Sequence, residues 1–121
     1  MDMDTIDPVA TAKTVQKNRV GHCFRTAPEG GCVVAAGYRM DSTRVDVDNL
    51  ARLRDRMLET GAVSVTIRDQ SNQFHDVTVA ELSTIVGELI DFGLGLYARK
   101  WQLESEIAAA GTVEGVEAVV W

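Results

Sequence analysis

The stretch that decides the fold runs from Thr78 to Ala110 and reads TVAELSTIVGELIDFGLGLYARKWQLESEIAAA. It opens with Thr78-Val79-Ala80-Glu81, the order of a capping box, in which the threonine oxygen accepts the N3 amide and the glutamate reaches back. Apolar side chains then recur every three or four residues, which is the spacing of one face of an α-helix. The members of this stripe are Leu82, Ile85, Leu89, Phe92, Leu96, Leu103 and Ile107, with Val86, Ile90, Tyr97 and Trp101 on its flank.

An unbroken helix over this stretch measures about 48 Å. That length exceeds the width of a compact domain of 121 residues, which is about twice a radius of gyration of about 13–14 Å. Gly87, Gly93 and Gly95 each weaken a helix by up to about 1 kcal/mol relative to alanine, so a kink near Gly93 to Gly95 is the alternative.

The excess length favours a seam between copies of the chain, because heptad-like spacing and small glycines suit helix–helix association. The apolar, aromatic end of the chain also needs a surface to pack on. We therefore expect a homo-oligomer, either a dimer or a trimer. Its interface is expected to use Leu82, Ile85, Leu89, Phe92, Leu96, Tyr97, Trp101, Leu103, Ile107 and Trp121.

Two further helices and a hairpin are expected before the long helix. Asp7-Pro8 suits the start of a helix that ends at Gly21. Residues 22–41 read as extended, with turns at 28–31 and at Ala36-Gly37. A second helix begins after 41–43 and runs to about Thr60, and Gly61 is its stop.

Strand signals, and one last short helix, complete the pattern. Residues 63–68 alternate between apolar and polar, and Phe74 and Val77 mark a return strand, so the two form a hairpin. Gly111-Thr112 ends the long helix and caps a short one that starts at Val113. The fold class is therefore α+β, mainly helical, with short antiparallel β-hairpins packed on a long C-terminal helix.

Length, charge and composition argue against several classes of protein. The 121 residues suit one domain over 1–121, with a loosely docked N-terminal helix in 1–21 and a compact core in 22–121. A net charge of −6 argues against unaided binding to nucleic acid or to an anionic membrane. The acidic first residues do not resemble a signal peptide, and no apolar run is long enough for a membrane span.

Residue types that carry chemistry are present but do not form a recognisable site. His22, Cys23, Cys32 and His75 lack metal-ligand spacing, and we expect the cysteines to be buried hairpin residues. A Cys23–His75 nucleophile pair has no orienting group or oxyanion site in view. The sequence thus predicts no catalytic residue, no metal and no cofactor. The acids Asp41, Asp46, Asp48 and Asp55 suit the start of a helix without an ion, and the arginines among them suit a solvated, paired face.

Several motifs occur in an order that resembles a known family. They are Tyr38 to Ser42, Asn49, Val65 to Asp69 with Asn72, Val77 to Leu82, Leu96 to Lys100, and Ile107 to Val116. The order is similar to a domain of unknown function that is common in tailed-phage and prophage proteins, often as the C-terminal part of tail or tail-fibre proteins. The strand motif of that family reads W/I-R-x-x-D-N, and here Asp69 and Asn72 are split by two residues. The resemblance covers roughly residues 10–121 and rests on turns, caps and apolar positions.

The resemblance implies a role in a virion or in phage morphogenesis. We expect a non-enzymatic structural or interaction protein, tail-associated, that acts through self-association and through contacts with other phage tail proteins. Its expected location is the virion or the cytoplasm of a bacterial host. A tail-fibre assembly chaperone is the alternative, and a small metal- or cysteine-dependent enzyme is a remote one.

Overall fold

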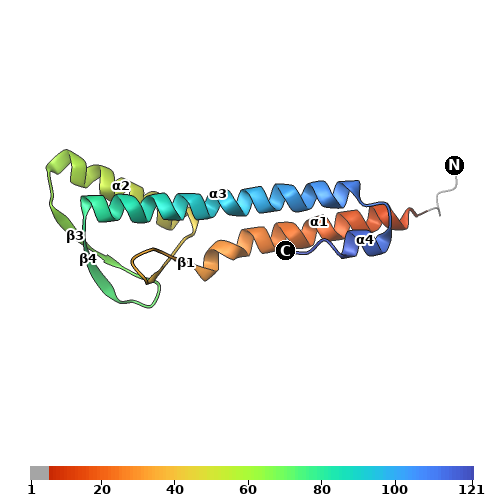
Figure 1. The fold of residues 1–121 in the computed structure, drawn as a ribbon, viewed down its shortest axis with the longest axis horizontal. Coiled ribbons are helices and arrows are strands. Elements are labelled where there is room, and N and C mark those ends of the chain that lie inside the picture. The colour runs from red at the N-terminus through yellow and green to blue at the C-terminus, as the bar shows by residue number, and fades with distance from the viewer. Residues whose placement is uncertain (1–5) are drawn as a thin grey trace. The chain divides into compact units, whose positions relative to one another are not determined.

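The computed structural model of the protein describes residues 6–121 (Figure 1). In chain order the elements are α1 (Pro8–Thr26), the 3-10 helix η1 (Ala27–Gly30), β1 (Cys32–Val33), β2 (Arg39–Met40), α2 (Arg44–Thr60), β3 (Ser64–Arg68), β4 (Phe74–Thr78), α3 (Val79–Ala109) and α4 (Val113–Glu117). This order confirms the expected α+β class, with short antiparallel hairpins and a long C-terminal helix.

The described residues form two compact units, and α3 contributes to both. The hairpin unit is Ala27–Gly95, and the helical unit joins the residues up to Thr26 with Leu96–Trp121. Helical residues continue without a break through Gly93 and Gly95. Each unit has a hydrophobic core of its own.

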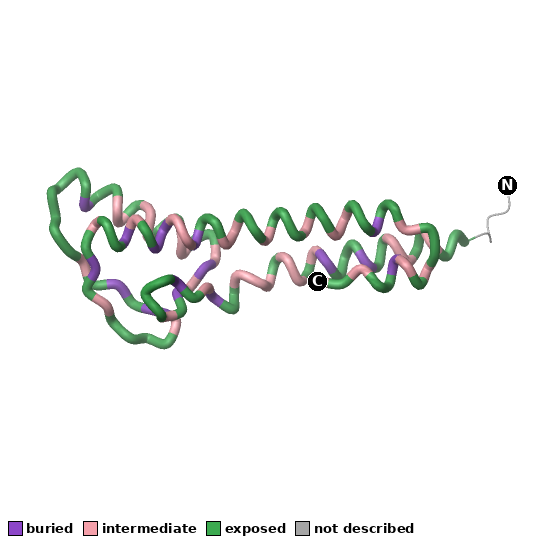
Figure 2. Tube along the Cα trace, viewed as in Figure 1, coloured by how far each residue is buried: buried purple, intermediate pink, exposed green. Residues whose placement is uncertain are grey.

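The hairpin unit is built from two antiparallel strand pairs, α2 and the N-terminal part of α3. β1 pairs with β2, and β3 pairs with β4 in a register that places Val65 opposite Val77. Because side chains alternate along a strand, Ile67 and Val77 face inward while their neighbours face water. They join a buried cluster, shown as purple segments in Figure 2, whose other members are Val34, Met40, Met57, Leu82, Ile85, Val86 and Leu89.

Capping residues fix where α2 and α3 begin. Thr43 and Asp46 form a capping box, in which the Asp46 amide donates to the Thr43 hydroxyl oxygen at 3.4 Å. At α3 the Glu81 amide donates to the Thr78 oxygen at 3.2 Å, as the sequence predicts. The Glu81 carboxylate, however, accepts from the Thr78 hydroxyl at 3.1 Å.

The helical unit packs α1 against α4 and the C-terminal part of α3. Val20, Ile107 and Val116 are its fully buried centre, and Trp121 packs against them. Gln16 donates from Nε2 to the carbonyl of Val119 at 2.6 Å, which ties the last residues of the chain to α1.

The structure corrects the expected end of the first helix. α1 continues through Gly21 to Thr26, and η1 follows, so the extended segment that the sequence predicts from residue 22 begins only with β1. The Phe24 ring explains the difference, because it contacts Tyr97 at 4.7 Å and Trp121 at 6.4 Å between ring centroids. Such aromatic pairs contribute about 0.5–1.5 kcal/mol each beyond the area they bury, enough to offset a glycine in a helix.

Candidate functional site

The soft metal ligands are distributed over both units. His22 and Cys23 lie on α1 of the helical unit, whereas Cys32 and His75 lie on strands of the hairpin unit. Cys23 is therefore not a hairpin residue, and both cysteines are free and half-buried rather than buried. Within residues 6–121, no three His, Cys, Asp or Glu side chains gather as a metal site would require.

Cys32 is also poorly suited to act as a nucleophile. Burial raises the pKa of its thiol, and the negative charge of Glu88 raises that pKa further. The thiolate is the reactive form, so a raised pKa lowers its population at neutral pH.

Asp69 and His75 form a partly buried polar cluster in the hairpin unit. The carboxylate of Asp69 is 4% exposed, and one of its oxygens lies 2.7 Å from Nε2 of His75. Its other oxygen accepts from the amides of Ser71 and Gln73 at 2.8 and 3.0 Å, which closes the β3–β4 turn. The His75 ring stacks on Tyr38 with centroids 3.7 Å apart, so the cluster joins the two hairpins.

This cluster predicts a pH dependence of stability. The His75 hydrogen bond, helped by the amides of Gln73 and Ser71, lowers the pKa of Asp69 although burial opposes the shift. A lowered folded-state pKa stabilises the protein above the unfolded value of about 3.9, and this stabilisation is lost as the pH falls through the folded value. We expect the wild-type Tm to fall in this range more steeply than that of Asp69→Asn, measured by thermal melts across pH.

The matched control for that measurement is Asp55→Asn. Asp55 is exposed on α2 and bonds only to its neighbour Arg54 in the described part of the chain. This variant should keep the acid dependence of the wild type. An Asp69→Asn profile parallel to the wild-type profile would contradict the assignment.

The other acids and arginines of α2 lie where the sequence predicts a solvated, paired face. Exposed pairs join Arg44 to Asp48 and Arg56 to Glu59 on that helix. Asp46 is occupied by the capping box of Thr43. These groups hold the helix and its surface in place.

Aromatic side chains gather on the helical unit. Phe24, Tyr97, Trp101 and Trp121 form a chain of ring contacts, which we call the aromatic cluster, with centroid distances between 4.7 and 6.4 Å. Arg99 lies over the Trp121 ring at 4.9 Å, and Lys100 over Phe24 at 4.7 Å. Trp101 is 61% exposed and Tyr97 is 44% exposed, so part of the cluster faces water.

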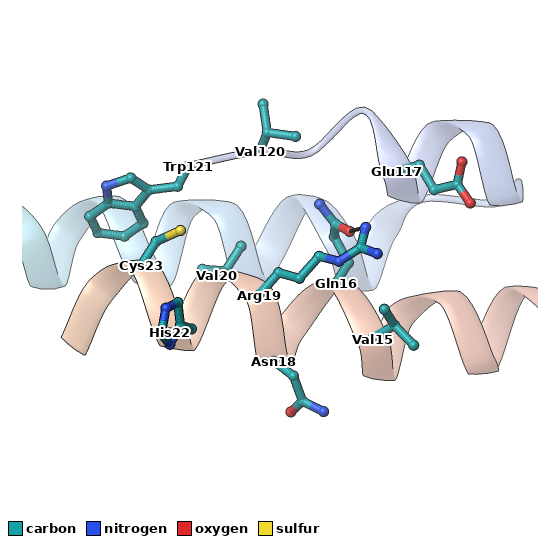
Figure 3. Close-up of a pocket in the computed structure, with 10 residues that line it drawn as sticks. All are labelled: Val15, Gln16, Asn18, Arg19, Val20, His22, Cys23, Glu117, Val120 and Trp121. Carbon is teal, nitrogen blue, oxygen red and sulfur yellow. Dashed lines mark hydrogen bonds between the residues drawn. The ribbon is translucent and has the colours of Figure 1, made fainter. Parts of the chain in front are cut away.

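A groove lies beside this cluster, between α1 and the C-terminal segment (Figure 3). Its volume is about 740 Å³, and a second hollow of about 360 Å³ shares Val15, Gln16, Arg19 and Glu117 with it. The two hollows are therefore neighbours along α1, and we call them together the α1–α4 groove. The first hollow is lined by Val15, Gln16, Asn18, Arg19, Val20, His22, Cys23, Glu117, Val120 and Trp121.

The expected interface residues divide between core and surface. Leu82, Ile85 and Leu89 are buried in the hairpin unit, and Ile107 is buried in the helical unit. Phe92, Leu96, Leu103 and Trp121 are half-buried, and Tyr97 and Trp101 are exposed. Sequence reasoning did not assign Val15 and Val120 to a site. The only signals for them were a thin apolar stripe on the first helix and an apolar end of the chain.

No helix formed by residues 6–121 combines the length and the apolar character that crossing a bilayer requires.

Comparison with known proteins gives one match. No curated protein and no solved structure matches the chain. The match is to the model of a family described as a domain of unknown function (DUF4376), and it covers residues 11–120. It thus includes α1 from Thr11 onward, both hairpins, α2, α3 and α4. The chain belongs to the DUF4376 family of domains.

Proposed function

We propose that this protein is a non-enzymatic interaction protein that self-associates through its helical unit. The observation that carries this proposal is the apolar surface that the unit presents to water. Trp101, Val120 and Tyr97 are 61%, 62% and 44% exposed, and Val120 also lines the α1–α4 groove. Large exposed apolar patches on soluble proteins commonly mark interaction sites, and aromatic residues are enriched in their centres.

Several polar groups support the same proposal because they have structural roles. Asp69 and His75 bond to each other and hold a turn. Thr43 and Asp46 cap α2, and Gln16 ties the C-terminal segment to α1. A catalytic base is instead expected to reach a substrate from a cleft.

The setting that we propose is a tailed phage or prophage, with the protein bound to tail components. This rests on the order of motifs from Tyr38 to Val116 and on membership of a family with no assigned function. Mass spectrometry of purified particles tests the setting. Stoichiometric presence supports a tail subunit, whereas presence in infected cells but not in particles supports an assembly chaperone.

Self-association has a direct test in the mass of the protein in solution. We expect light scattering coupled to gel filtration to give two or three times the chain mass of 13.2 kDa at high micromolar concentration. Val120→Ser should lower that mass because it removes an exposed apolar side chain of the helical unit that also lines the α1–α4 groove. Leu58→Ser, at a 62% exposed position on α2 in the hairpin unit, is the control. A strictly monomeric wild type at this concentration would contradict the proposal.

A further inference from the structure

We propose that the α1–α4 groove is the interface of a two-fold dimer, occupied by the same groove of a second copy. This inference rests on the proposed self-association and specifies its surface and symmetry. The groove has two walls, α1 on one side and the segment from α4 to Trp121 on the other. Figure 3 shows Arg19 between these walls and Val120 on the C-terminal segment.

The first argument is the charge pattern of the groove. Among the described residues that line the two hollows, only Arg19 and Glu117 have side chains that are charged at neutral pH, with histidine taken as neutral. Arg19 lies on α1 and Glu117 lies on α4, so each wall has one charged side chain, and the two are of opposite sign. Arg19 donates to the side-chain oxygen of Gln16 at 3.3 Å, and neither charge forms an ion pair with any of residues 6–121.

The second argument is that this pattern is its own complement. In a two-fold dimer the same patch serves both partners, so it must match itself. A two-fold axis parallel to the groove brings α1 of each copy against the α4 wall of the other. Arg19 of each copy then lies opposite Glu117 of the other, which gives two contacts between opposite charges. An axis across the groove would instead place Arg19 near Arg19 of the second copy, and like charges disfavour that arrangement.

Both walls also have an exposed apolar residue. Val15 on α1 is 43% exposed, and Val120 on the opposite wall is 62% exposed. Each wall thus adds an exposed valine to the surface that the second copy would cover. Val20 lies 1% exposed on the floor of the groove, so the walls rest on the core of the helical unit.

The area of the groove indicates how tightly the proposed dimer should associate. From Pro8 to Cys23 it follows α1 for about 22 Å, and two walls of helix width span about 20 Å. This footprint is smaller than the roughly 800 Å² per partner of a standard stable interface. We therefore expect a reversible dimer whose dissociation constant lies in the micromolar range, within reach of sedimentation velocity.

Charge reversal tests the proposal. Arg19→Glu and Glu117→Arg should each weaken dimerisation at least about tenfold, because each creates two like-charge contacts. The double variant R19E/E117R restores opposite charges across the axis and should recover the wild-type dissociation constant to within about threefold. Both residues are exposed, so circular dichroism should show an unchanged fold.

The matched control is Lys17→Glu. Lys17 is exposed on α1, lies outside the groove, and undergoes the same change of charge as Arg19→Glu. It should leave the dissociation constant unchanged. A mixture of wild type and R19E/E117R provides a second readout, because like charges would face each other in a hybrid and few hybrid dimers should form.

The outcomes of these experiments distinguish a failure of the groove as interface from a failure of self-association itself. A wild-type dimer that tolerates both single reversals overturns the groove as interface and leaves self-association standing. Single reversals that weaken the dimer without recovery in the double variant overturn the two-fold arrangement. An effect of Lys17→Glu equal to that of Arg19→Glu also overturns it. A monomeric wild type overturns both proposals, and the groove would then be open to a helix of a different protein.

Discussion

Leu89→Ala should lower the free energy of unfolding by about 2–5 kcal/mol. Leu89 is 1% exposed and lies in the buried cluster of the hairpin unit, where Ile67, Val77 and Ile85 also lie. Truncation removes the transfer free energy of the side chain and leaves a cavity. The members of this cluster come from β3, β4 and α3 itself, so we expect the cavity to be enclosed and unable to collapse without moving these elements.

Leu94→Ala is the matched control for this prediction. It makes the same chemical change on the same helix, but Leu94 is 61% exposed. Surface substitutions usually change stability by less than about 0.5 kcal/mol. Urea denaturation followed by circular dichroism measures both variants. Equal losses for Leu89→Ala and Leu94→Ala would mean that the assigned buried face of α3 is wrong.

Gly31→Ala should destabilise the hairpin unit by about 2–5 kcal/mol, because two costs add. The backbone of Gly31 has a φ of +75°, which L side chains rarely adopt. An added Cβ would also lie 2.7 Å from the carbonyl oxygen of Met40 and 2.8 Å from the side-chain amide of Gln70. Met40 is held in register with Cys32, so its backbone cannot move without breaking the strand pair.

Gly61→Ala separates the two costs. Gly61 ends α2 with a φ of +71°, and an added Cβ there meets nothing within 4 Å. This variant should lose only the conformational cost of about 1–2 kcal/mol. The difference between the two variants in urea denaturation is then the cost of the close contact. Equal losses would contradict that contact.

Local signals in the sequence were sufficient for most of the hairpin unit. The alternation over 63–68, the cap at Thr78 and the stop at Gly61 all lie where the structure has them. The start of α2 also falls after 41–43 as predicted, and the structure selects Thr43 as its N-cap. Each is decided by neighbours within four residues, through side-chain period or a short hydrogen bond. The start of α4 at Thr112, whose oxygen accepts from the Gly115 amide at 3.0 Å, belongs to the same class.

The first helix shows where local reasoning was insufficient. Gly21 and the turn residues near Pro28 predicted an early end, but α1 continues to Thr26. Phe24 and Tyr97 lie far apart in the sequence, and their ring contact exists only once α1 and α3 pack together. The placement of Cys23 on a helix follows from the same contact.

The candidate site was predictable only in part. The aromatic residues Tyr97, Trp101 and Trp121 were expected to form an interface because they are large, apolar and spaced along one helix or placed at the chain end. The structure separates the exposed Trp101 from the buried Leu89 and Ile107, which the spacing alone could not do. Periodicity gives a face to a helix but does not show how much of that face the chain itself covers.

The fold class, the cap at Thr78 and the long helix from Val79 could be predicted from the amino-acid sequence, because they depend on interactions between near neighbours. Only the tertiary structure decided the length of α1, the pairing of Asp69 with His75, and the groove between α1 and α4. Arg19 and Glu117 lie on walls formed by opposite ends of the chain. Local periodicity cannot bring such residues together; packing of the whole helical unit does, because its core needs Val20, Ile107 and Val116 at once.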